Sequence, residues 1–179
     1  ATATGDILLA GGARKEFNSA SIGHGGYRLG GTSTGSIQVR AAAGKVILTA
    51  GGGDDAVQNI TTTGEHSYSS AQIGHGVANV VSGNLSGDIC VVGFAGVEMA
   101  ARDLPVSEAG EGERAQTQIG HGGYNARGDF SGSISVVAPD GSVTLAGGQN
   151  GSEGQYSQIG HGGILADGTE DKWLTGQAA

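Results

Sequence analysis

The tetrapeptide Ile-Gly-His-Gly occurs four times in this chain of 179 residues, at spacings of 51, 46 and 40 residues. The four copies occupy residues 22–25, 73–76, 119–122 and 159–162. Recurrence at such a period is typical of proteins in which one supersecondary unit stacks on the next. We therefore expect residues 1–179 to form a single repeat domain. Its predicted units span approximately 1–31, 32–83, 84–128 and 129–168, with a tail or cap at 169–179.

Two further segments recur in register with the motif, and both have the pattern of β-strands. The first, at 35–39, 87–91 and 132–136, alternates apolar residues with mostly polar ones. The second follows eight or nine residues later, at 46–50, 97–101 and 143–147, and residues 6–10 are another copy. A period of two is typical of a half-buried strand. With the motif as a third strand, each unit is predicted to hold about three strands, in fewer than four full coils.

Two all-β architectures are compatible with this pattern. In a parallel β-solenoid, equivalent strands of successive units stack, so identical motif residues lie over one another. In the alternative, the first and second strands of a unit form an antiparallel hairpin, for which Pro139-Asp140-Gly141 supplies turn-forming residues. We favour the solenoid because a hairpin series gains nothing from an unvarying Ile-Gly-His-Gly. The connections at 14–19, 52–67, 102–117 and 148–154 vary in length and are rich in acidic residues, so we expect the most mobile corner there.

The histidines of the motif are the candidate functional residues. Within each copy the isoleucine and the histidine share one parity, so they are expected on the same side of the strand. The isoleucines are Ile22, Ile73, Ile119 and Ile159, and the histidines are His24, His75, His121 and His161. Stacked units would place four imidazoles in one column, where burial should hold their pKa values below the ordinary value of about 6.5.

Such a column could be structural, could coordinate a metal, or could act in acid–base catalysis. A column offers a metal ion at most two neighbouring imidazoles, whereas zinc sites usually gather three or four ligands. Four equivalent copies also do not describe one active site. We therefore predict a structural row, with no catalytic, cofactor-binding or metal-binding residue.

Composition excludes other classes of function. The formal net charge of −8 argues against a partner made of nucleic acid. No apolar run reaches the roughly 18 residues of a membrane-spanning helix. Cys90 is the only cysteine, so no internal disulfide can form.

The rhythm Gly-Ser-Ile-Ser-Val followed by Gly-Ser-Val-Thr-Leu-Ala-Gly, in register with Gln-Ile-Gly-His-Gly-Gly, resembles filamentous-haemagglutinin-type bacterial surface proteins over roughly residues 5 to 168. The resemblance implies a right-handed parallel β-helix that is secreted to the cell surface as an adhesin or an extracellular fibre. The expected function is therefore non-enzymatic and structural or adhesive. The expected partners are copies of the chain stacked end to end, or the rest of a longer chain, with a cell-surface or glycan receptor. A carbohydrate-active or carbohydrate-binding β-helix module is the alternative.

Overall fold

The computed structural model describes residues 1–12, 18–26, 28, 30–50, 68–78, 82–101, 114–148 and 155–164. These residues form strands β1 to β15 and contain no helix, so the expected all-β class is confirmed. Most of the acidic connections, and the tail at 169–179, lie outside the described residues.

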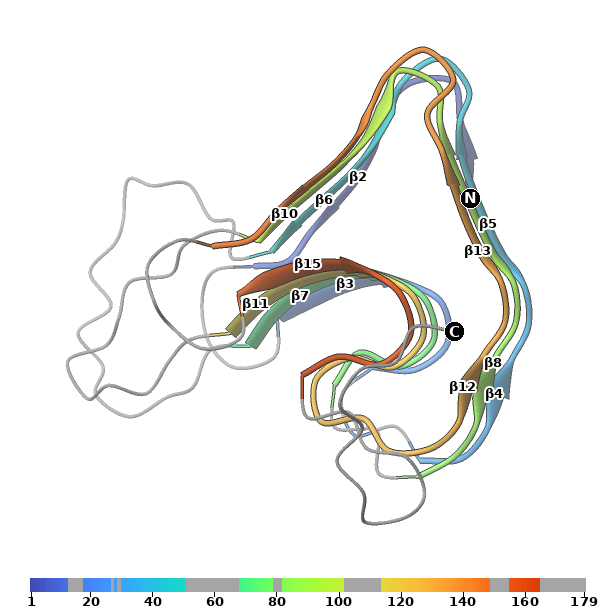
Figure 1. Ribbon diagram of the computed structural model, residues 1–179, viewed down its shortest axis with the longest axis vertical. Coiled ribbons are helices and arrows are strands. Elements are labelled where there is room, and N and C mark those ends of the chain that lie inside the picture. Colours follow the sequence, from blue (N-terminus) through green and yellow to red (C-terminus); the bar gives the residue numbers. More distant parts are fainter. Residues whose placement is uncertain are drawn as a thin grey trace, which may run out of the picture.

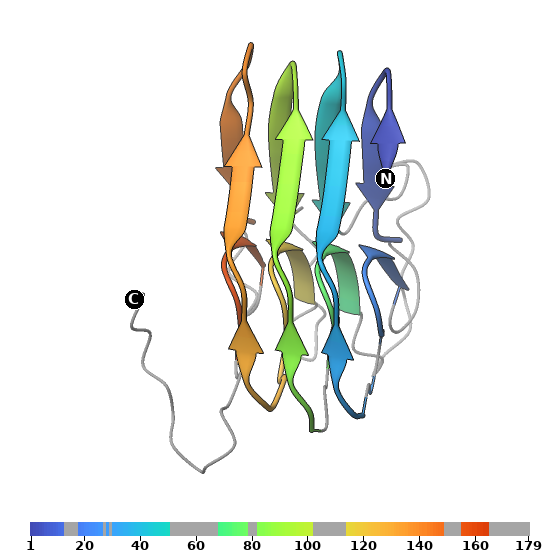
Figure 2. The ribbon, with the colours of Figure 1, turned by 90° about the vertical axis from the view of Figure 1, so that its right-hand side faces the viewer.

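The three predicted strands of each unit lie in three separate sheets, each four strands deep (Figures 1 and 2). The first-strand sheet has the order β1-β5-β9-β13, and the second-strand sheet has the order β14-β10-β6-β2. The motif strands form the third sheet, in the order β15-β11-β7-β3. The bounds of the first set are Thr2–Ala3, Ile37–Ala41, Ile89–Gly93 and Ile134–Val137 for β1, β5, β9 and β13. Those of the second set are Ile7–Ala10, Lys45–Ala50, Gly96–Ala101 and Val143–Ala146 for β2, β6, β10 and β14. Those of the third are Asn18–Ile22, Tyr68–Ile73, Arg114–Ile119 and Tyr156–Ile159 for β3, β7, β11 and β15.

Every strand pairing in these sheets is parallel and joins equivalent residues of successive units. Ile22, for example, pairs with Ile73, and Ile73 with Ile119. The antiparallel hairpin alternative is therefore wrong for the described strands, because the first and second strands of a unit belong to different sheets. Stacked parallel sheets of this kind are consistent with a parallel β-solenoid.

A fourth, shorter sheet was not predicted. It is formed by two-residue strands in the order β12-β8-β4, with bounds Phe130–Ser131, Leu85–Ser86 and Ser33–Thr34. Each of these strands is followed directly by a glycine, at Gly35, Gly87 and Gly132. That recurring Ser/Thr-Gly pair was a signal in the sequence, but two residues are too few to show a strand periodicity.

The core consists of aliphatic side chains stacked in columns. Along β5 and β6, every second residue is buried, which confirms the predicted alternation. The register places Leu9, Leu48, Met99 and Leu145 in one column, in that order along the stack. Neighbouring columns meet between the sheets in one buried cluster that includes Val39, Leu48 and Ile73. Slender side chains suit this interior, because side chains stacked in one column are only about 4.8 Å apart, the distance between neighbouring strands.

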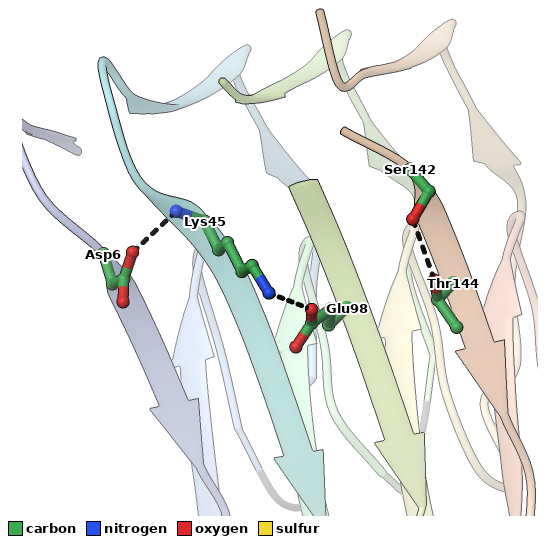
Figure 3. A network of polar contacts seen from close by, with 5 residues as sticks. All are labelled: Asp6, Lys45, Glu98, Ser142 and Thr144. Carbon is green, nitrogen blue, oxygen red and sulfur yellow. Dashed lines mark hydrogen bonds and ion pairs between the residues drawn. The ribbon is translucent and has the colours of Figure 1, made fainter. Parts of the chain in front are cut away.

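Polar contacts join coils on the outer face of the β2-β6-β10-β14 sheet (Figure 3). Asp6 Oδ1 accepts a hydrogen bond of 2.7 Å from the backbone N–H of Lys45, and Lys45 Nζ lies 2.6 Å from Glu98 Oε1. The hydrogen bond to Glu98, and then its charge, raise the pKa of Lys45. Both side chains of the ion pair are substantially exposed to solvent, so its contribution to stability is small.

Candidate functional site: the histidine column

The motif lies where the chain leaves each strand of the third sheet and curls back beneath it (Figure 1). The four imidazoles that follow these strands form one column. The ring centroids of His24 and His75 are 4.9 Å apart, those of His75 and His121 are 4.7 Å apart, and those of His121 and His161 are 4.8 Å apart. Adjacent ring planes are within 10° of parallel. The structure thus places all four predicted histidines together, as the sequence predicted.

One ring nitrogen of each histidine in the last three coils bonds to the preceding coil. The backbone N–H of His24 donates to His75 Nδ1 at 3.0 Å. The same bond joins His75 to His121 and His121 to His161, both at 3.1 Å. Since Nδ1 accepts in each case, the neutral ring carries its proton on Nε2.

The other ring nitrogen forms a hydrogen bond across the interior with the carbonyl oxygen of a glycine. The Nε2 atoms of His75, His121 and His161 lie 2.9, 2.8 and 3.0 Å from the carbonyl oxygens of Gly35, Gly87 and Gly132. These glycines follow the short strands β4, β8 and β12. Each of these imidazoles therefore links the motif both to the previous coil and to the opposite corner of the fold.

Burial is complete only in the middle of the column. His75 and His121 are buried, whereas His24 is exposed and His161 half-buried, because each lies in an outermost coil. Burial lowers the pKa of His121, and the neighbouring His161 and His75 act in the same direction, against the hydrogen bond to Gly87. The depressed pKa that the sequence predicted is thus found at His121.

Three of the four motif isoleucines lie in or against the aliphatic core. Ile73 and Ile119 are fully buried there, and the partly buried Ile22 packs against the same cluster. Ile159, in the last coil, is 36% exposed. In the two middle coils, the motif therefore contributes one buried isoleucine and one imidazole that hydrogen-bonds to the preceding coil.

The first glycine of the motif is required by the close approach of the coils. A Cβ atom on Gly74 would lie 1.8 Å from the carbonyl oxygen of Gly120, and one on Gly120 would lie 1.8 Å from that of Gly160. No side chain fits at such a distance. The φ angles, 158° for Gly74 and 157° for Gly120, also lie at the edge of the region that only glycine adopts readily.

Two buried glutamines complete the site, in a role that was not predicted from the sequence. The Gln72 amide Nε2 donates to the carbonyl oxygens of Gly120 and Gly122, both at 2.9 Å. Gln118 Nε2 does the same one coil later, to Gly160 at 2.9 Å and Gly162 at 2.7 Å. The signal was the glutamine directly before the isoleucine in three of the four copies, with Ser21 in the first.

These contacts determine what the column can do chemically. Both ring nitrogens of His75 and His121 are engaged in hydrogen bonds, so neither ring offers a free lone pair to a metal or a substrate. Among the described residues, no three histidine, cysteine, aspartate or glutamate side chains are grouped so that they could hold a metal ion. The hydrogen bonds of these rings join neighbouring coils.

The described part of the chain contains no helix with the length and hydrophobicity that crossing a membrane requires. No protein-family model matches the chain, and neither a curated protein nor a solved structure matches it significantly.

Proposed function

We propose that this chain is a non-enzymatic structural or adhesive segment of a secreted bacterial surface or filament protein, in which it forms part of a stalk or fibre. The observation that carries the proposal is the use made of the histidine column. The rings of His75 and His121 contact the coil before them and the opposite corner of the fold, and both of their ring nitrogens are engaged. The motif that defines the repeat thus holds neighbouring coils together.

In this proposal the coils wind as a right-handed solenoid with three longer strands per coil, as the resemblance to filamentous-haemagglutinin-type proteins implies. Parallel pairing of equivalent residues supports a rod that lengthens with each added repeat. An experimental structure would test the handedness directly.

The acidic composition of the chain also fits a role outside the cell better than a role on nucleic acid. The net charge of −8 keeps such a rod soluble and repels polyanions.

The proposal is tested on intact cells of the source organism. An antibody raised against the purified chain should label intact cells as strongly as permeabilised ones, and protease added outside should remove the label. Labelling that requires permeabilisation would contradict a surface location.

A glycan array of the purified chain separates a passive spacer from the alternative of a carbohydrate-binding module. A spacer binds no glycan class above background. Saturable binding to one class would favour the alternative.

A further inference from the structure

We propose that the C-terminal edge of the stack binds the N-terminal edge of a second copy of this chain, so that the histidine column continues from one molecule into the next. The N-terminal edge consists of β1, β2 and β3, and the C-terminal edge consists of β13, β14 and β15. The inference rests on the proposed structural function and names the partner. Strand edges without a partner strand are templates for pairing with another chain. Among the described residues, the outermost strands of both edges belong to the same parallel sheets.

The backbone bonds of the motif repeat between every pair of described coils. Gly74 N–H donates to the carbonyl of Ile22, and Gly76 N–H to that of His24, both at 2.9 Å. Gly120 and Gly122 repeat these bonds to Ile73 and His75, also at 2.9 Å. Together with the bond from the histidine N–H to the next Nδ1, each interface has three motif bonds.

Each edge of the stack carries one partner of each of these three hydrogen bonds. At the C-terminal edge, the carbonyls of Ile159 and His161 and the N–H of His161 form no bond to a further coil within the described residues. At the N-terminal edge, the N–H groups of Gly23 and Gly25 and the Nδ1 of His24 occupy the complementary positions. Head-to-tail stacking pairs the two carbonyls with the two glycine N–H groups and pairs His161 N–H with His24 Nδ1.

Gln158 supplies a second complementary contact. Gln72 and Gln118 each donate to two glycine carbonyls of the following coil. Within the described part of the chain, the Nε2 of Gln158 has a 3.3 Å contact to His161 O, in its own coil, and none to a further coil. In the stacked pair, the carbonyls of Gly23 and Gly25 of the second copy stand where Gln158 can reach them.

The aliphatic columns are open at the same edge. Val143, Leu145 and Ile159 are 39%, 43% and 36% exposed, although they continue columns in which Val97, Met99 and Ile119 are 1% exposed or less. The other ends of these columns are Ile7, Leu9 and Ile22 at the N-terminal edge. Stacking would therefore bury apolar side chains against apolar side chains.

The contact is heterologous, because two different surfaces meet, and a translation along the stack does not close into a ring. Such contacts generate open filaments. Three of the four sheets continue across the junction, while the short sheet has only the strands β12, β8 and β4 among the described residues, so β12 meets no described short strand of the second copy. With a charge of −8 on every copy, salt should promote assembly by screening repulsion.

The test is sedimentation and electron microscopy of the whole chain and of Leu145→Lys. In a free molecule the lysine ammonium at position 145 can reach water, but in the stacked pair it would lie buried against an aliphatic column without a partner. Thr144→Lys is the matched control, since Thr144 lies on the same edge strand but next to Glu98 on the outer face (Figure 3). We expect filaments that grow with concentration and salt for the wild type and for Thr144→Lys. Leu145→Lys should need at least about a tenfold higher concentration.

A second variant, Gln158→Ala, removes one long hydrogen bond between described residues and should also raise the assembly concentration while its melting temperature stays close to that of the wild type. A wild-type chain that remains a 17.5 kDa monomer at the highest concentration and salt overturns the inference. Filaments that both variants leave unchanged overturn it as well. Neither result bears on the surface location, which the labelling of intact cells tests separately.

Discussion

The backbone N–H of His75 donates a hydrogen bond of 3.1 Å to the ring Nδ1 of His121, one coil further along the stack. The two residues hold the same position in the motif although 46 residues separate them in the chain. The same bond is repeated between successive coils. It makes each imidazole part of the backbone hydrogen-bond network, because the ring accepts a bond from an N–H group that is not paired within a sheet.

Replacing His121 by phenylalanine should destabilise the fold. The new ring can fill the space, but it leaves the N–H of His75 and the carbonyl of Gly87 without partners in a buried site. Each unsatisfied group costs about 1–3 kcal/mol. Equilibrium unfolding in urea should therefore show a loss of roughly 2 kcal/mol or more. His24→Phe is the control, because the His24 ring is exposed and its nitrogens accept no bond from another described coil. Equal losses in the two variants would contradict the role of the buried bonds.

Stability should decline in mild acid through His121. Its pKa is lowered in the folded state, so below the unfolded value of about 6.5 the unfolded chain binds the proton more readily than the folded chain. The free energy of unfolding should be greatest above that pH and fall as the pH drops toward the folded pKa. Melting temperatures from pH 8 to pH 4.5 measure this. His121→Phe should have a flatter profile than the wild type, and an unchanged slope would contradict the assignment.

Alanine at Gly120 should be far more destabilising than alanine at Gly160. Both glycines have a φ of 157°, so the backbone strain of the substitution is the same. A Cβ at Gly120 meets the carbonyl oxygen of Gly160 at 1.8 Å, whereas one at Gly160 meets nothing closer than the amide of Gln158 at 3.1 Å. The difference in melting temperature at low protein concentration thus isolates the contact between coils. Similar melting temperatures would mean that the coils can separate at little cost.

Glutamine at position 21 should stabilise the first coil. Ser21 pairs with Gln72 in the strand register and is exposed. A glutamine there can donate to the carbonyls of Gly74 and Gly76, as Gln72 does to those of Gly120 and Gly122. We expect a gain of about 1 kcal/mol in urea unfolding, the typical net value of a hydrogen bond. Ser21→Leu, which cannot donate, should not give this gain.

The repeat motif and its alternation were enough to predict parallel stacked sheets and the column of imidazoles. Both follow from a rule that acts along the chain. Side chains alternate with a period of two in a strand, and identical residues at one register position lie over one another when strands stack in parallel. Ile73 in the core, and His121 between His75 and His161, are where that rule places them.

Only the tertiary structure decided which atoms the histidines and glutamines bind. The carbonyls of Gly35 and Gly87 directly follow short strands that are too brief to leave a periodic pattern, and they reach His75 and His121 only through the way the chain turns back across the interior. The same turn brings the glycine carbonyls within reach of Gln72 and Gln118. The sequence by itself determined which segments stack and in what register, because these depend on local alternation and repetition, and it favoured the parallel direction that the pairing of the sheets then established. The cross-section of the coil, and with it the partners of each buried polar group, depended on contacts between segments far apart in the chain.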